Sequence, residues 1–506
     1  MTRRQTSPLV VALVIVLGLI APLMDTTIVN VAIPSLRSDL DATVSTIQWV
    51  STGYLLAMAV AIPVTGWASQ RWGARRMWLA GLWLFLIGSV LAGLAWNTGS
   101  LIGFRALQGV AAGLLIPIMQ TLLIGGGAAG GPGGGAPMRN MMALISLPAL
   151  LGPVFGPVIG GLIVNHMSWR WIFYVNPPIC LVAIALAMVF LPRDAGIRTH
   201  RLDLVGLLLL SPAVAGIVYG LSELGNRGGV AHAAVLLPLV GGAVLLGAFL
   251  WHALRTAEPL VDLRLFKVRT FSAAGALLFL TGMASFGALL LLPLYYQQLR
   301  GDSVVVAGLL MMPQGIGIAL SRGVAGVAER WGARTVVLTA VLLSIAGTLP
   351  FAFAGPDTSP VLLAAALVVR GAGLGTVMMA VLFGAYEGLA KPQIPHASTT
   401  TRILQQLGGS FGTAVLAVLL QRGLAAHAAD PAVAFDHAFA WSIALSLPAL
   451  VAAFFVPGRK RPGDAGPESD RTRVGGRPTD GPAVEDGHSG DRSDPMSDQP
   501  VVADRR

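Results

Sequence analysis

The chain has 506 residues, of which 55% are hydrophobic and only 11% are charged. An average soluble domain carries about 25% charged residues, so this chain has too few to cover a water-facing surface. The composition therefore excludes a soluble enzyme. It also excludes a wholly disordered chain, which would combine low hydrophobicity with high net charge. In so apolar a chain, the net charge of +10 indicates Lys and Arg flanking membrane spans.

Long apolar runs recur along the chain. About 20 apolar residues form one helix that crosses the hydrocarbon core of a bilayer. The runs predict about fourteen spans, near residues 9–33, 47–68, 78–96, 101–124, 140–164, 172–191, 204–222, 231–251, 271–295, 303–321, 335–354, 360–384, 401–420 and 437–456. The first run is longer than the apolar region of a signal peptide, and no small-residue cleavage site follows it, so we expect it to be retained.

Two segments differ from this pattern. Residues 125–137 are mostly glycine and predict a flexible loop between spans four and five. From Pro457 onward the chain is rich in Gly, Asp, Pro and Arg with almost no apolar runs, which is typical of a disordered tail.

Positive residues are divided unevenly between the two sides of the predicted spans. One set of loops holds sixteen of them: Arg71, Arg75, Arg76, Arg139, Arg193, Arg198, Arg201, Arg255, Arg264, Lys267, Arg269, Arg322, Arg330, Arg334, Lys391 and Arg402. The opposite loops hold five: Arg37, Arg170, Arg227, Arg300 and Arg422. Cytoplasmic loops carry the excess of Lys and Arg, so this asymmetry predicts that both termini are cytoplasmic and that the number of spans is even.

One short sequence occurs twice, each time just after the second span of a group. The segment Gln70 to Arg75 (QRWGAR) recurs as Glu329 to Arg334 (ERWGAR). If spans seven and eight are an insertion, the other twelve form two six-helix halves related by a parallel repeat. We therefore expect an N-terminal half at 1–203, two inserted helices at 204–251, a C-terminal half at 252–457 and a cytoplasmic tail at 458–506.

Asp25 stands within the first predicted span, roughly 12 Å from its outer end at 1.5 Å per residue. An ionised carboxylate at that depth is costly unless it is paired or hydrated, and acids inside membrane spans usually mark proton or substrate pathways. Asp25 is therefore a candidate proton-coupling residue. The alternative is a structural carboxylate bonded to a neighbouring helix.

Two arginines also lie within predicted spans. Arg105 enters span four from the outer side and is expected at a depth similar to that of Asp25. A guanidinium beside the carboxylate favours its charged form, so such a pair would couple conformation to protonation. Arg105 could instead form a plain structural ion pair or extend to the outer surface. Arg370 lies deeper, in span twelve, as a possible cavity charge without an evident acidic partner.

Span five contains glycines and prolines at close spacing. The candidate hinge residues are Gly152, Gly156, Pro157, Gly160 and Gly161. Glycines at this spacing permit close helix contact, and prolines bend the helix axis. Taken alone, the motif is more typical of packing than of function.

Motifs for enzyme chemistry are missing from the sequence. Cys180 is the single cysteine, and none of the three lysines follows the glycine of a nucleotide-binding Walker A loop. The histidines lack metal-ligand spacing, and the basic loops are too interrupted for a nucleic-acid surface. We expect neither an enzyme nor a nucleotide-binding protein, with no metal and no cofactor.

Five sequence segments, taken together, match one family of membrane proteins. They run from Met24 to Pro34, from Gln48 to Tyr54, from Arg105 to Gly109, from Gly152 to Gly161 and from Trp169 to Pro177. In combination they resemble the fourteen-span drug:proton antiporters of the major facilitator superfamily, over about residues 9–456. The resemblance implies an all-α polytopic membrane protein with the major facilitator fold, two six-helix halves and two inserted central helices. It also implies that Asp25 and Arg105 form the proton-coupling pair and that the span-five motif marks an exporter.

The resemblance also implies a cytoplasmic gating loop in each half. Its matching residues are Gly66, Arg71, Gly73, Arg75 and Arg76 in the first half, and Glu329, Arg330, Gly332 and Arg334 in the second. Gln70 stands where the family has an acid, so this residue does not supply the negative charge for the contact that helps to lock the inward gate. The loop between spans four and five, usually charged in the family, is here mostly glycine.

These observations favour a proton-driven exporter of lipophilic or cationic drugs, dyes or antibiotics that works by alternating access in the bacterial cytoplasmic membrane. We expect it to act as a monomer whose partners are the lipid bilayer, small-molecule substrates and protons. A dedicated exporter of one metabolite, lipid or self-made antibiotic would share the same machinery. A membrane sensor or scaffold without transport is the alternative from another class.

Overall fold

The computed structural model describes residues 7–42, 44–125, 156, 159–164, 166–192, 201–227, 229, 231–321, 332–386, 389 and 393–456. Within these ranges the regular structure is helical and contains no strand. Some predicted features lie outside the described residues: the glycine-rich loop after residue 125, Gly152 and Pro157 with most of span five, Glu329, Arg330 and the tail 458–506.

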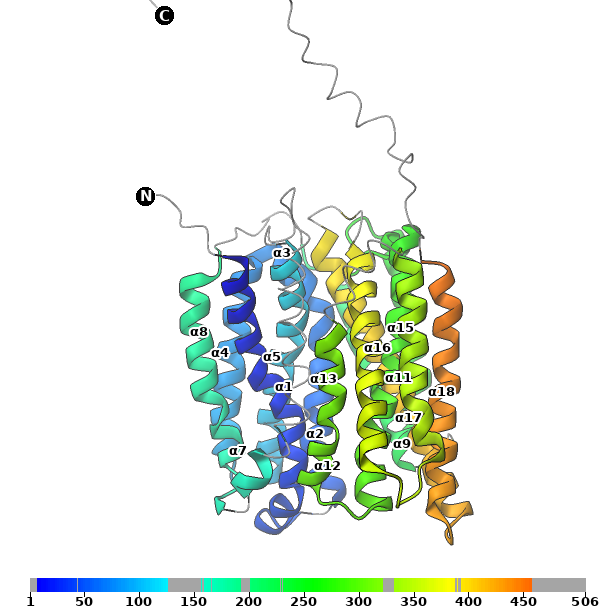
Figure 1. Cartoon of the computed structure of the whole chain (residues 1–506). Helices are drawn as coiled ribbons and strands as arrows, with labels where there is room; N and C mark the ends of the chain where they lie inside the picture. Colours follow the sequence, from blue (N-terminus) through cyan, green and yellow to red (C-terminus); the bar gives the residue numbers. More distant parts are fainter. Residues whose placement is uncertain are drawn as a thin grey trace, which may run out of the picture. The chain divides into compact units, whose positions relative to one another are not determined.

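A first group of helices lies on the left in Figure 1. It comprises α1 (Pro8–Asp39), α2 (Val44–Ala61), the 3-10 turn η1 (Ile62–Val64), α3 (Thr65–Trp72), α4 (Ala74–Gly93), α5 (Thr98–Gly125), α7 (Trp171–Tyr174) and α8 (Asn176–Phe190). The helices α9 (Leu204–Arg227) and α10 (Ala233–Arg255) follow, and then the turn η2 (Leu263–Lys267).

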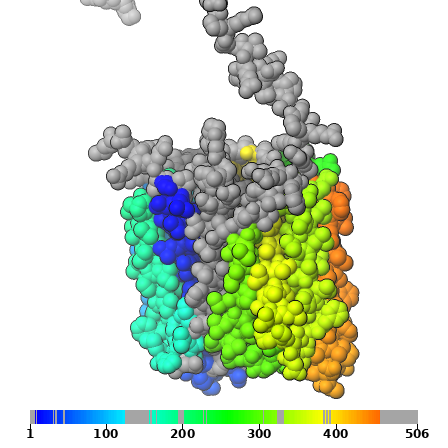
Figure 2. Space-filling view, in the orientation of Figure 1, coloured from blue at the N-terminus to red at the C-terminus, as the bar shows by residue number. Residues whose placement is uncertain are grey.

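A second group lies on the right. It comprises α11 (Arg269–Leu294), the π-helical turn η3 (Tyr295–Leu299), α12 (Val304–Leu310), α13 (Met312–Leu320), α15 (Ala333–Thr348), the turn η5 (Leu349–Phe353), α16 (Pro360–Tyr386), α17 (Ile394–Ala426) and α18 (Pro431–Phe454). Figure 2 shows the same face with side chains, with α8 on one flank and α18 on the other.

Twelve of the described helical segments are long and apolar enough to cross a membrane. The span expected at 303–321 consists of two shorter helices, α12 and α13, which are interrupted at Met311 just before Pro313. Most of the span expected at 140–164 lies outside the described residues. The total of fourteen spans therefore stays a prediction, whereas the all-α polytopic architecture is confirmed.

The packing partners within the first group recur within the second. In the first group, α2 packs on α5, α4 packs on α5 and α8, and α1 packs on α8. In the second, α13 packs on α16, α15 packs on α16 and α18, and α11 packs on α18. The helices α9 and α10 pack on each other, and α9 also contacts α2 and α17. The residue boundaries proposed for the halves and the insertion stay predictions.

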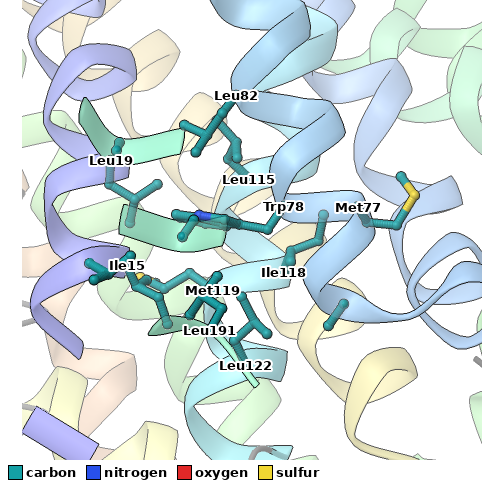
Figure 3. Packing of buried hydrophobic residues seen from close by; sticks show 14 of the residues in the cluster. Ile15, Leu19, Met77, Trp78, Leu82, Leu115, Ile118, Met119, Leu122 and Leu191 are labelled. Atoms are coloured by element: carbon teal, nitrogen blue, oxygen red, sulfur yellow. The ribbon is translucent and has the colours of Figure 1, made fainter. Parts of the chain in front are cut away.

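The core of the first group is built around an indole ring. Trp78 of α4 is fully buried and lies between Ile15 and Leu19 of α1 and Leu115 of α5 (Figure 3). A Cβ atom at Gly18 would approach the Trp78 ring to 2.6 Å, so the glycine lets α1 lie against the indole. Burial of this large apolar ring holds α1, α4 and α5 together.

The predicted start of span thirteen is wrong. The structure begins α17 at Ile394 instead of residue 401, because a run of hydroxyl residues lowers the local hydropathy without ending the helix. The hydroxyls of Ser398, Thr399 and Thr400 donate to carbonyl oxygens four residues earlier, at 2.9, 3.1 and 2.8 Å, so they are satisfied within the helix. Arg402, expected in a cytoplasmic loop, consequently lies inside α17, about 12 Å from its first residue.

The repeated sequence forms the same local structure twice. Gly73 precedes α4 with φ 89° and ψ 145°, and Gly332 precedes α15 with φ 84° and ψ 149°. Arg75 donates to a carbonyl oxygen in the last turn of α8, and Arg334 Nε donates to the carbonyl oxygen of Val456, just after α18, at 3.1 Å. Each guanidinium thus pairs with carbonyl groups at the C-terminal end of the last helix of its own group.

This backbone conformation yields the first prediction. Side chains other than glycine rarely adopt it, so Gly73→Ala and Gly332→Ala should each cost about 1–3 kcal/mol of stability. The measurement is thermal unfolding of the purified protein in detergent. Gly103→Ala is the control, because Gly103 is helical and a Cβ atom there meets open space. Unfolding temperatures equal to wild type for both variants would contradict the prediction.

Candidate functional site

An ion pair joins α1 to α5 in the interior of the first group of helices. Arg105 Nη1 donates to Asp25 Oδ2, and the exposed fractions of the two side chains are only 1% and 0%. Because α1 continues to Asp39, Asp25 lies about 21 Å before the end of its helix, which extends beyond the end expected for the first span at residue 33. The structure therefore brings together the two residues expected to form a pair.

Asn176, the first residue of α8, donates a hydrogen bond to the other carboxylate oxygen of Asp25. Its Nδ2 lies 3.3 Å from Asp25 Oδ1 and 2.9 Å from Ser89 Oγ on α4, and it donates to both. The Ser89 hydroxyl in turn donates to the carbonyl oxygen of Phe173 at 2.8 Å. These hydrogen bonds fix the orientation of the Asn176 amide, so Asp25 is hydrogen-bonded to both α5 and α8.

The guanidinium of Arg105 is held on several sides. Its Nε donates to the carbonyl oxygen of Val50 at 3.2 Å, and its Nη1 lies 3.3 Å from Gln108 Oε1. The guanidinium carbon lies 4.2 Å from the ring centroid of Tyr54, a cation–π contact that adds to the binding of a desolvated cation. Tyr54 is buried and its hydroxyl donates to the carbonyl oxygen of Pro22 at 3.4 Å, which links α2 to α1.

This arrangement is matched to an ionised carboxylate. Asp25 accepts from a guanidinium and an amide, which offsets part of the cost of keeping its charge away from water. Addition of a proton would remove the charge that Arg105 pairs with and weaken both hydrogen bonds. Loss of this charge would therefore loosen the contacts that α1 makes with α5 and α8.

The span-five glycines that the structure describes pack directly against this part of α1. A Cβ atom on Gly156 would lie 2.0 Å from Thr27 Oγ1, and one on Gly160 would lie 2.8 Å from Ile28 Cγ1. Gly161 faces α12 of the second group instead, where a Cβ atom would lie 3.5 Å from Val305. The motif thus allows close approach to the helix segment that follows Asp25.

Arg370 of α16 is buried in the second group and meets neutral oxygens. Its Nη1 donates to Gln314 Oε1 on α13 at 2.6 Å, and its Nε donates to Thr348 Oγ1 on α15 at 3.2 Å. In the described part of the chain it forms no ion pair with a carboxylate. Its partners, which the sequence left open, therefore differ from those of Arg105.

The two groups of helices touch at the end that carries α3. A Cβ atom on Gly66 would lie 3.0 Å from Thr399 Oγ1 of α17, so the glycine permits this close approach. The hydroxyl oxygen of Tyr386, on α16, lies 3.2 Å from Gln120 Oε1 of α5 and 3.1 Å from Ser398 Oγ, and its single hydrogen can be donated to either oxygen. Of the other loop residues, Arg71 is half-buried in α3 and Arg76 is exposed in the first turn of α4.

Several site residues were not identified as such from the sequence. Asn176 and Tyr54 stand in motifs that matched the family, yet nothing in the sequence shows that they contact the Asp25–Arg105 pair. Gln108 carries a weak signal, since it lies one helical turn after Arg105. No group of three or more His, Cys, Asp or Glu side chains that could hold a metal ion occurs among the described residues.

The sequence model of the Major Facilitator Superfamily matches residues 15–413. The chain belongs to this superfamily. Its relatives include the "Multidrug resistance protein B homolog" of Mycobacterium tuberculosis H37Rv, 38% identical over 414 residues that cover 80% of this chain and 75% of the relative. The "Putative multidrug resistance protein MdtD" of Serratia proteamaculans is 30% identical over 456 residues, covering 87% and 92%.

A solved structure shows the same fold. The proton:xylose symporter XylE superposes with a TM-score of 0.62 at 15% identity, over 89% of this chain and 96% of that one. At this identity the similarity shows the fold alone. The protein is therefore a polytopic membrane transporter with the major facilitator fold, and the predicted family membership is confirmed.

The geometry of the ion pair gives a second prediction. Arg105→Gln leaves the Asp25 carboxylate buried without its cation, which should cost about 3–5 kcal/mol. The double variant Asp25→Asn with Arg105→Gln leaves two amides in place of two charges and should recover most of this loss. A double-mutant cycle on thermal unfolding measures the coupling. Additive effects of the single substitutions would show that the pair contributes no interaction energy.

Proposed function

We propose that this protein is a proton-coupled exporter of lipophilic compounds that acts as a monomer by alternating access. It lies in the bacterial cytoplasmic membrane with both termini in the cytoplasm, and the proton gradient drives it without a bound cofactor. Membership of the superfamily and the relatives named for multidrug resistance support export. The observation that carries the coupling is the full burial of Asp25 in α1 between two hydrogen-bond donors on other helices.

In this mechanism a proton from outside neutralises Asp25. The ionised carboxylate holds α1 against α5 and α8, and the neutral acid releases Arg105 and Asn176. The resulting shift of α1 passes to span five through the close contacts at Gly156 and Gly160. The two groups of helices then move so that the protein closes on the outside and opens to the cytoplasm, where Asp25 releases its proton. With Asp25 ionised and substrate bound, the protein returns to the form that is open to the outside.

The contacts between Tyr386, Gln120 and Ser398 form the cytoplasmic closure in this scheme. They join α16 and α17 of the second group to α5 of the first. Opening towards the cytoplasm, which substrate loading requires, breaks the hydrogen bond between Tyr386 and Gln120. The same α5 carries Arg105, so one helix takes part in both the coupling site and the closure.

The proposal predicts that Asp25→Asn abolishes proton-driven efflux while the protein still reaches the membrane. Asparagine keeps the size of the side chain but does not bind and release a proton. The assay is dye transport in inverted vesicles with an imposed pH gradient and a protonophore control. Asp41→Asn, on an exposed residue beyond α1, is the matched control and should transport like wild type. Retention of gradient-driven transport in Asp25→Asn would disprove the coupling role.

The substitution Asn176→Ala tests the contribution of the Asn176 amide to proton coupling separately from that of Asp25 itself. Hydrogen bonds to charged groups contribute about 1.5–3 kcal/mol. The substitution removes one of the two donors to the Asp25 carboxylate, so the pH profile of efflux should shift. Thr26→Ala is the control, because among the described residues the Thr26 hydroxyl donates to the Leu23 carbonyl oxygen within α1 and not to another helix. An unchanged pH profile in Asn176→Ala would assign the amide a purely structural role.

A further inference from the structure

The position of Arg402 in α17 gives this helix a charge inside the protein that the proposed mechanism does not use. Arg402 lies one helical turn beyond Ser398, which takes part in the cytoplasmic closure, and on the same face of the helix. The next residue, Ile403, packs in a cluster with Tyr54 and Met58 of α2. Arg402 therefore lies just inside the closure, where the second group of helices meets the first.

The hydrogen bonds of Arg402 are incomplete. Its Nη1 donates to Gln405 Oε1 on the same helix at 3.0 Å, and its buried Nε has no acceptor among the described residues. Gln405 directs its own amide nitrogen at the sulfur of Met378, 3.5 Å away, which is a weak acceptor. Two neighbouring donors thus lack a good oxygen acceptor, and buried donors are normally paired.

The charge of Arg402 is also unmatched. It forms no ion pair with a carboxylate in the described ranges. The ion pair of Asp25 with Arg105 has no net charge, so it does not offset the charge of Arg402. Arg402 directly precedes Ile403, which packs in the same cluster as Tyr54, the residue whose ring covers Arg105. The contact zone between the two groups therefore holds excess positive charge, which repels a cation and attracts an anion.

We propose that Arg402 and Gln405 bind the anionic group of the transported compound, and that the substrates are lipophilic molecules with a single carboxylate, sulfonate or phosphate group. An oxyanion supplies the acceptor that Arg402 Nε and Gln405 Nε2 lack. The apolar side chains of Ile403 and Met58 pack together while the two groups of helices are in contact, and they become available to the rest of the molecule when the groups separate. This assignment rests on the proposed export function and names its substrate class.

The membrane potential acts in opposite directions on an exported anion and an exported cation. An anion that leaves the cell is driven outward by a potential that is negative inside, whereas an exported cation is opposed by it. Export of a monovalent anion against an entering proton moves positive charge inward in both steps. An imposed potential of this sign should therefore accelerate transport of an anionic probe.

The test uses two dyes that differ only by the charged group. The full chain is reconstituted in phosphatidylcholine vesicles, and gradient-driven transport is measured for 8-anilinonaphthalene-1-sulfonate and for its neutral parent, N-phenyl-1-naphthylamine. The sulfonate stays ionised throughout the pH range of the assay. Arg402→Gln should raise its half-saturation concentration at least about tenfold and leave that of the neutral dye within about twofold. Arg402→Lys should keep most of the wild-type behaviour.

Arg422→Gln is the matched control, because Arg422 is exposed near the other end of α17. Equal losses for both dyes in Arg402→Gln, or no transport of the sulfonate by wild type while the neutral dye is exported, would overturn the anion site. No gradient-driven transport of either dye or of the cation ethidium by wild type would contradict the proposed function itself. Addition of phosphatidylglycerol separates the two sources of an anionic group. Competition that disappears in Arg402→Gln would assign the site to a lipid headgroup and overturn its assignment to a free compound.

Discussion

The first group of helices is organised around the burial of one carboxylate and one guanidinium. A charged pair away from water is tolerated only when its remaining hydrogen-bonding groups are also satisfied, so four helices must converge on Asp25 and Arg105. Asn176 approaches from α8, and Tyr54 and the Val50 carbonyl approach from α2. Small residues make this convergence sterically possible. At Gly109, for example, a Cβ atom would lie 2.2 Å from the Tyr54 carbonyl oxygen.

The second group uses the same packing scheme with different charges. Its helices pair in the same order, and Gly332 repeats the backbone conformation of Gly73. Yet Arg370, on the helix whose packing corresponds to that of α5, meets an amide and a hydroxyl where Arg105 meets a carboxylate. Only one of the two groups thus contains a buried acid paired with an arginine among the described residues. Proton coupling and anion binding, as proposed above, are therefore divided between the two groups.

The features of this protein that can be predicted from its sequence depend on the free energy of transfer from water to the membrane. Apolar runs locate most helices within a few residues, and Asp25 is conspicuous because an acid in such a run is costly. The partners of Asp25 depend on how each helix is rotated about its axis, which hydropathy does not report. Asn176 and Tyr54 were therefore unassigned, and Arg402 was misplaced because intrahelical bonds from Ser398 to Thr400 hide a helix within a polar run.

The contacts that close the cytoplasmic end differ in strength from the contacts of the Asp25–Arg105 ion pair. The closure contacts that the structure shows, Tyr386 with Gln120 and Gly66 against Thr399, are uncharged. Neutral hydrogen bonds contribute only about 0.5–1.5 kcal/mol each, because water replaces them when they break. Protonation of a paired carboxylate changes the free energy of its contacts by a similar or larger amount. In the proposed mechanism, a single proton at Asp25 would therefore be sufficient to shift the balance between closed and open forms, provided that the closure stays weak. The family resemblance implies a charge contact at the gate from an acid at residue 70, where this chain has Gln70, and such a contact would strengthen the closure and make the same proton less effective.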